Sequence, residues 1–147
     1  MTTPTSEVLA ERVKHADPPN LAALEERFGP LPDTVIVTYA PHIYVPGGGK
    51  LTPALEAHET VHLGQQGNDP AGWWARYLTD DTFRLEQELE AHRAEWRVAR
   101  AEITDRNRRS RELHLISRRL ASPLYGNMLT TAEATRLVRA QKHPPRV

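Results

Sequence analysis

The residues best suited to chemistry lie in the pentapeptide from His58 to His62, which reads His-Glu-Thr-Val-His. On an α-helix, residues four apart lie about 40° apart around the axis and one turn along it, so both imidazoles can reach one ion. Imidazole nitrogen is a preferred zinc ligand, and a carboxylate beside the first histidine can take a proton from a water on the metal. The spacing therefore predicts one Zn²⁺ per chain, bound by His58 and His62, with Glu59 as general base.

The sequence around this pentapeptide predicts the helix that the pattern requires. Thr52 is suited to the N-cap, Pro53 to the first helical position, and Gly64 and Gly67 to the end. On such a helix four apolar residues fall within about 60° of His58: Leu51, Ala54, Leu55 and Val61. The two histidines should therefore point inward. Burying both without a metal would be unfavourable, which favours a metal site over a structural pair.

A catalytic zinc ion needs a third protein ligand, and the helical pattern from about 81 to 103 offers four candidates. They are Glu86, Glu88, Glu90 and His92. Measured around the axis from the centre of the apolar stripe, which we place at Leu85 and Ile103, Glu88 lies about 60° away. Glu86 and Glu90 lie about 100° and 140° away, toward solvent. Glu88 is therefore the expected third ligand, and Glu86 is the alternative.

Two competing roles stay open on this helix. Glu88 is also placed for a surface ion pair with Arg84, one turn earlier. His92 lies about 20° from the centre of the stripe, which suits a hydrogen-bonding partner behind a metal ligand as well as a core histidine.

Length and composition indicate one domain, residues 1–147, with one core. The formal net charge is zero, so neither a nucleic acid nor an anionic membrane is expected as a partner. The chain has no cysteine, which leaves zinc to histidine and carboxylate ligands. We expect a cytoplasmic protein, because the sequence shows neither a leader pattern nor an apolar run of membrane-spanning length. The oligomeric state is not indicated.

The remaining patterns predict a mainly helical α+β fold. Further helices are expected at residues 6–15, 21–28, 71–78, 109–121 and 130–140, and strands rich in β-branched residues at 34–39 and 43–45. The strands should form a small antiparallel sheet that precedes the motif helix. Prolines flank the second strand, which indicates an edge position.

Three further segments carry expectations. The aromatic cluster Trp73, Trp74 and Tyr77 is expected in the core, and the arginine-rich stretch 106–119 on a solvated helix face. Residues 1–30 should form a helical segment that either braces the core or covers the site. Residues 142–147 should form a flexible tail.

His58-Glu59-Thr60-Val61-His62, followed on a later helix by Glu88-Leu89-Glu90-Ala91, resembles the gluzincin metallopeptidases. In several of their families, including minimal single-domain forms and the prenyl-protein endopeptidases, the third ligand begins a Glu-x-x-Ala motif. More narrowly, residues 54–127 are similar to small metallopeptidase-like proteins of tailed phages and prophages. This similarity includes the runs 73–78 and 122–126. His92 departs from the prenyl-endopeptidase pattern, which has Asp at that position.

The resemblance implies a zincin-like domain that hydrolyses peptide bonds, with His58, His62 and Glu88 as ligands and Glu59 as base. Glu59 would take a proton from the attacking water and pass it to the leaving amine. Our candidate donor to the oxyanion is Tyr125, in a turn between a proline and a glycine. A peptide or protein substrate would pair with the edge strand at 43–45. If the chain is phage-encoded, it would act in the host cytoplasm.

Two other classes of function stay open. The chain can be a zinc-stabilised structural or adaptor protein that cleaves nothing, for example in a phage particle. It can also be a nucleic-acid-associated protein that uses residues 106–119, although its zero net charge counts against this.

Overall fold

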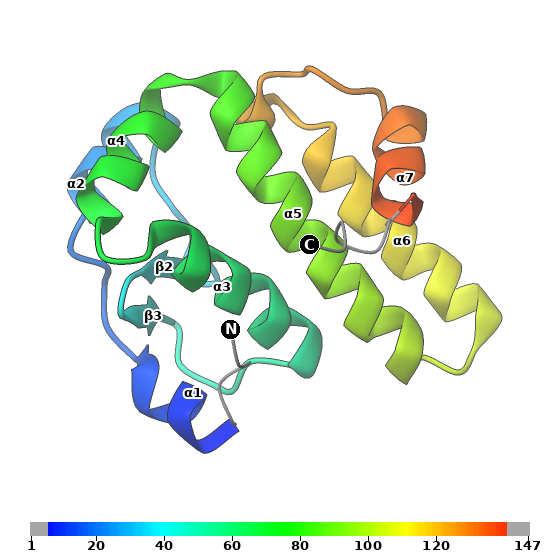
Figure 1. The fold of residues 1–147 in the computed structure, drawn as a ribbon, viewed down its shortest axis with the longest axis horizontal. Helices are drawn as coiled ribbons and strands as arrows, with labels where there is room; N and C mark the ends of the chain where they lie inside the picture. Colours follow the sequence, from blue (N-terminus) through cyan, green and yellow to red (C-terminus); the bar gives the residue numbers. More distant parts are fainter. Residues whose placement is uncertain (1–5, 141–147) are drawn as a thin grey trace, which may run out of the picture.

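The computed structural model describes residues 6–140, which contain seven α-helices, one 3₁₀ helix, η1 (Pro123–Tyr125), and three short strands (Figure 1). The helices are α1 (Ser6–Arg12), α2 (Leu21–Phe28), α3 (Pro53–Gln66), α4 (Pro70–Thr79), α5 (Asp81–Glu102), α6 (Arg106–Leu120) and α7 (Thr131–Arg139). The mainly helical prediction is confirmed. The tail expected at 142–147 lies outside the described residues. No helix in the described range is both long and apolar enough to cross a membrane.

Polar N-caps and glycine fix the ends of the motif helix α3. The Thr52 hydroxyl accepts a hydrogen bond from the Leu55 amide at 3.2 Å, and Pro53 fills the first helical position. Gly67 ends the helix with φ of 56°, a left-handed value that favours glycine. Helix α5 begins in the same way, because the Asp80 carboxylate accepts from the Phe83 amide at 3.0 Å. Local sequence thus determines where both α3 and α5 begin.

The sheet has three strands in the order β1-β3-β2, and it is mixed where the sequence predicted an antiparallel sheet. Strand β2 (Val37–Tyr39) pairs antiparallel with β3 (His42–Tyr44), as a hairpin requires. Strand β1 (Val13–Lys14) pairs parallel with β3, at the end of the segment predicted as helix 6–15. The Val45 amide donates to the Lys14 carbonyl at 2.8 Å. This tertiary pairing overrides the helical tendency of two residues.

The expectation of an edge strand at 43–45 was wrong, because β3 is the central strand. Strand β2 lies at one edge of the sheet, but side chains already form hydrogen bonds with main-chain groups along its free edge. The Gln66 amide donates to the Thr38 carbonyl at 2.8 Å and accepts from the Ala40 amide at 2.7 Å. The Trp74 indole also donates to the Thr38 carbonyl, at 3.0 Å. An extended peptide therefore could not use these groups at residues 38–40.

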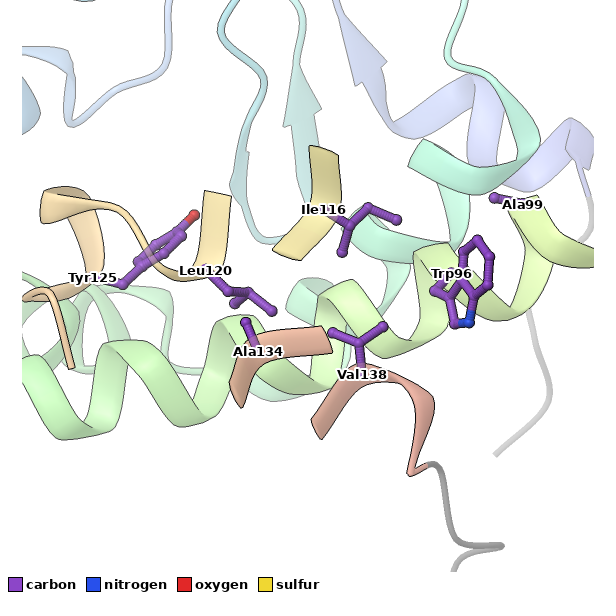
Figure 2. Close-up of a cluster of buried hydrophobic side chains, with 7 residues drawn as sticks. All are labelled: Trp96, Ala99, Ile116, Leu120, Tyr125, Ala134 and Val138. Atoms are coloured by element: carbon purple, nitrogen blue, oxygen red, sulfur yellow. The ribbon is translucent and has the colours of Figure 1, made fainter. Parts of the chain in front are cut away.

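Helix α5 is the central element, with α3 packed on one side and α6 and α7 on the other (Figure 1). The cluster between α5, α6 and α7 consists of Trp96, Ala99, Ile116, Leu120, Tyr125, Ala134 and Val138 (Figure 2). A second cluster contains Trp73, Trp74 and Tyr77 of α4 packed with Leu24 of α2, which confirms the core position predicted for the aromatic residues. Leu24 is buried, so α2 braces the core.

Candidate metal centre

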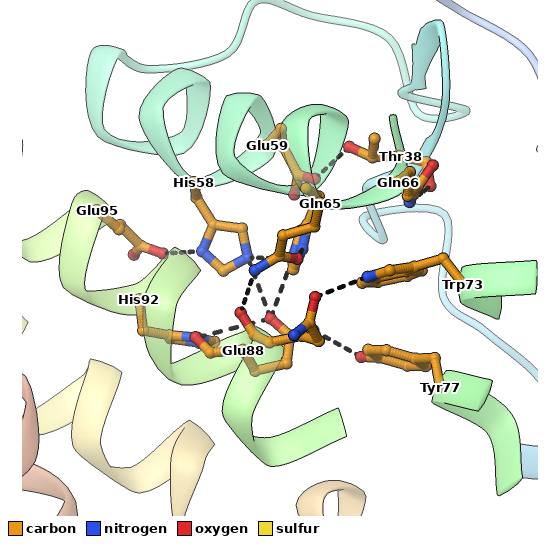
Figure 3. Close-up of polar contacts among 12 residues, drawn as sticks. Thr38, His58, Glu59, Gln65, Gln66, Trp73, Tyr77, Glu88, His92 and Glu95 are labelled. Carbon is orange, nitrogen blue, oxygen red and sulfur yellow. Dashed lines mark hydrogen bonds and ion pairs between the residues drawn. The ribbon is translucent and has the colours of Figure 1, made fainter. Parts of the chain in front are cut away.

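Three side chains from two helices bring their ligand atoms together in a small triangle (Figure 3). The Nε2 atoms of His58 and His62 lie 3.2 Å apart, and Glu88 Oε1 lies 3.4 Å from the first and 3.1 Å from the second. Figure 3 shows His58 and Glu88 pointing toward each other. All three residues are buried, with exposed fractions of 7%, 5% and 5%. The structure thus brings together the three residues that the sequence predicted as ligands.

The burial pattern of α5 supports the choice of Glu88 among the carboxylates of this helix. Glu88 is buried, whereas Glu86 and Glu90 are exposed, as the position of the apolar stripe predicted. The alternative ion pair between Glu88 and Arg84 does not form. The Arg84 guanidinium donates instead to the main-chain oxygens of Tyr77 and Leu124, at 2.9 and 3.1 Å.

Hydrogen bonds behind the two imidazoles direct both Nε2 atoms into the triangle. The Nδ1–H of His58 donates to Glu95 Oε1 at 2.8 Å, and that of His62 donates to Gln65 Oε1 at 2.8 Å. The Gln65 amide nitrogen in turn donates to the Gln87 carbonyl at 2.9 Å, which fixes the orientation of the amide. Because each Nδ1 has an acceptor, the Nε2 atoms are free to ligate a cation.

The dimensions of the triangle fit a tetrahedral ion. Zinc lies about 2.0–2.2 Å from nitrogen and oxygen ligands, so neighbouring ligands in a tetrahedral site lie about 3.3–3.6 Å apart. The three observed separations, 3.1, 3.2 and 3.4 Å, come within a few tenths of an ångström of this range. Three protein ligands would leave a fourth position for water or substrate. The site can therefore hold a metal ion.

The charges around the triangle form a strongly coupled set. Burial alone lowers the pKa of His58, but hydrogen bonds to Glu88 and Glu95 outweigh this and raise it to about 10. Burial likewise raises the pKa of Glu88, but the two neighbouring histidines hold it well below its usual value. Tyr77 donates to Glu88 Oε2 at 2.6 Å. The site thus keeps Glu88 ionised, and in a metal-free protein the compensating proton resides on the histidines.

Glu95 supports His58, and the sequence reasoning missed it. Its Oε2 accepts from Arg119 of α6 at 2.5 Å. Burial raises the pKa of Glu95, but hydrogen bonding to His58 and the charge of Arg119 lower it to about 2, so it is ionised. Glu95 lies seven residues after Glu88, about 20° further around α5, and this periodicity is the signal that could have found it. Gln65 lies one turn after His62, whereas no sequence signal indicated Tyr77.

His92 is a buried neutral histidine behind the triangle. Its Nδ1–H donates to the main-chain oxygen of Glu88 at 2.7 Å, and its ring centroid lies 4.6 Å from that of His58. Burial and the nearby charge of His58 lower the pKa of His92 to about 3. Its Nε2 has no hydrogen-bond partner within the described chain. His92, His58 and Glu95 form a second possible ligand set, but Glu95 is already engaged by His58 and Arg119.

Glu59 and Tyr125 both line the hollow that contains the triangle. Glu59 is not one of the three ligands, and its Oε2 accepts from the Thr38 hydroxyl at 2.6 Å (Figure 3). Tyr125 is buried in the core cluster, with its ring centroid 6.0 Å from that of His92. Burial and the charge of Glu88 raise the pKa of Tyr125 well above its usual value, so its hydroxyl keeps its proton.

The hollow has a volume of about 370 Å³, and apolar side chains form a wall in its lining. Residues of α2 and of the segment before β2 form this wall: Leu24, Phe28, Leu31, Val35 and Ile36. Helix α2 therefore also borders the site, in addition to bracing the core. The hollow thus combines the polar triangle, which could hold a metal ion, with space for apolar groups.

Comparisons of the chain with protein-family models, with curated proteins and with solved structures find no match. The function must therefore be inferred from the site itself.

Proposed function

We propose that the chain is a zinc-dependent peptidase of the gluzincin type, with a zincin-like fold. The observation that carries the proposal is the triangle of His58, His62 and Glu88 with the carboxylate of Glu59 in the same hollow. A His₂Glu ligand set is typical of catalytic zinc in peptidases. The sheet before α3 and the third ligand on a later helix agree with the resemblance drawn from the sequence.

Zinc bound by these residues would supply a Lewis acid that lowers the pKa of water toward about 7. Glu59 lies beside His58 on α3 without belonging to the triangle, so its carboxylate is available as a base. The Thr38 hydroxyl orients that carboxylate through one oxygen. Glu59 would remove a proton from the attacking water and deliver it to the leaving amine. The Tyr125 hydroxyl, which stays protonated, would donate to the developing oxyanion.

The apolar wall of the hollow indicates the class of substrate. A peptide with an aliphatic or aromatic side chain next to the scissile bond would bury that side chain against Leu24, Phe28 and Val35. Peptides with a charged side chain at this position would pay an uncompensated desolvation cost.

A zinc-stabilised structural protein is the second candidate, and the burial of all three ligands favours it. Digestion of a peptide library by the wild type and by Glu59→Gln distinguishes the two functions. The peptidase predicts that Glu59→Gln keeps zinc and fold but loses about 10²–10⁴-fold in turnover. The matched control is Glu56→Gln, which removes a carboxylate from the same helix one turn earlier and should leave turnover unchanged. The absence of cleavage by the zinc-loaded wild type would refute the peptidase.

A further inference from the structure

The zero net charge of the chain conceals a strong separation of charge along the sequence. Residues 1–92 contain six Lys and Arg against 14 Asp and Glu, a net charge of −8. Residues 93–147 contain 13 Lys and Arg against five Asp and Glu, a net charge of +8. The second part includes the end of α5 and all of α6 and α7. The zero net charge of the whole chain led us to expect no nucleic-acid partner. That reason does not apply to residues 93–147, which are strongly basic.

Four arginines of the basic segment 93–147 surround a single hollow of about 560 Å³. Arg100 comes from the last turn of α5, Arg106 and Arg109 from the start of α6, and Arg139 from the last turn of α7. The three helices pack against one another around the cluster that contains Trp96 (Figure 2), and Trp96 also lines the hollow. We name this hollow the arginine pocket.

Among residues 6–140, no acidic residue lines the arginine pocket, and Trp96, Ser110 and Leu113 complete its lining. None of its four arginines makes an ion pair within residues 6–140. In contrast, Arg84 and Arg119 elsewhere in the fold pair with Asp81 and Glu95. Four uncompensated guanidinium groups around one hollow repel each other, and an anion bound between them would remove that repulsion.

Phosphate is the anion that best matches this arrangement. The planar guanidinium presents paired N–H donors in a fork that fits phosphate oxygens, and the Ser110 hydroxyl adds a further donor. The positive charge also continues outside the pocket, on the exposed Arg108, Arg111 and Arg118 of α6. A surface of this extent suits a polyanion better than a single small phosphate.

We propose that the arginine pocket binds the phosphate backbone of a nucleic acid, and that the surrounding basic surface adds only weaker contacts. The pocket is separate from the metal centre, because Arg100 lies 12 residues after Glu88 on α5. This spacing corresponds to about 18 Å along the helix. The pocket requires neither zinc nor turnover, so the binding does not depend on the proposed peptidase activity.

The test is the binding of a short labelled DNA duplex to the full chain at increasing salt. Contacts from the four pocket arginines alone predict a slope of about −3 to −4 in the logarithm of the affinity against the logarithm of salt concentration, because affinity falls as salt rises. The double variant Arg106→Gln/Arg109→Gln should bind at least tenfold more weakly and reduce the magnitude of that slope by about 2. The matched control, Arg111→Gln/Arg118→Gln, removes the same charge from the same helix outside the pocket and should have a smaller effect.

Unchanged zinc content and melting temperature would show that each variant is folded, and Arg139→Gln provides a second variant on a different helix. Equal losses in the pocket and control variants would overturn the proposal, because binding would then come from the basic surface in general. Absence of binding by the wild type at low salt would also overturn it. Inorganic triphosphate serves as the small-anion probe. Displacement of the duplex only at much higher triphosphate concentration supports a nucleic acid, whereas tight triphosphate binding without duplex binding refutes it.

Discussion

Replacing Glu88 by glutamine tests the third ligand most directly. The carboxylate oxygen that lies 3.1 and 3.4 Å from the two histidine Nε2 atoms would be replaced by an amide of the same shape. The amide nitrogen can donate to the histidines while the amide oxygen accepts from Tyr77, which donates to Glu88 at 2.6 Å in the native site. The metal-free variant should therefore fold well, whereas its zinc affinity should fall.

The size of the effect follows from the stabilisation that bound metal gives to the folded state. Loss of a partner that only supports a ligand typically costs 10–100-fold in metal affinity, so loss of the ligand itself should cost at least about 100-fold. At saturating zinc this corresponds to about 2.7 kcal/mol less stabilisation. For a chain of 147 residues, the entropy of unfolding is about 0.3 kcal/mol per kelvin, so the zinc-dependent rise in melting temperature should shrink by about 9 °C.

Competition with a chromophoric chelator measures the affinity, and thermal unfolding with and without zinc measures the stabilisation. Glu86→Gln is the matched control, because it removes an exposed carboxylate from the same helix two residues earlier. It should leave both quantities unchanged. Equal sensitivity at the two positions, or a Glu88→Gln variant that zinc still stabilises as fully as the wild type, would refute the assignment of the ligands.

Two further predictions concern the surroundings of the ligands. Glu95→Gln keeps a hydrogen-bond acceptor for His58 but removes the negative charge of Glu95. Zinc affinity should therefore fall about 10–100-fold in the same competition assay. An unchanged affinity would make Glu95 a purely structural partner of Arg119. The pKa of His58 is raised to about 10 in the folded, metal-free protein. Protonation of His58 therefore stabilises the fold fully below about pH 6.5, and this stabilisation is lost as the pH rises toward 10. Zinc must displace that proton, so its affinity should rise about tenfold per unit between about pH 6 and 8, with proton release visible by calorimetry in buffers of different ionisation enthalpy. An affinity independent of pH would contradict this.

Local geometry explains why the sequence alone predicted the centre of the site. Residues four apart on a helix share a face whatever the rest of the chain does, so the pairing of His58 and His62 needed no tertiary information. The same periodicity separated Glu88 from the exposed Glu86. Caps such as Thr52 act within one turn, which is why the start of α3 was predicted to the residue.

Tertiary structure decided everything that depends on how distant segments meet. Strand β1 exists because β3, about 30 residues later in the chain, provides its hydrogen-bond partners, and no local pattern in Val13 and Lys14 indicates this. Periodicity places Glu95 near Glu88 on one flank of α5. Whether that flank meets His58 or solvent depends on how α3 packs across the helix.

The arginine pocket shows the same limit at a larger scale. A run of arginines in sequence predicts a solvated helix face, because each side chain can then point away from its neighbours. Most arginines of α6 are exposed, as predicted. The packing of α5, α6 and α7 also brings Arg100 and Arg139, 39 positions apart, around one hollow with Arg106 and Arg109. Sequence determines which residues share one helix face, since that relation is fixed by the helical repeat. Only the packing of the helices determines which faces meet, because that choice depends on the burial of apolar surface over the whole chain.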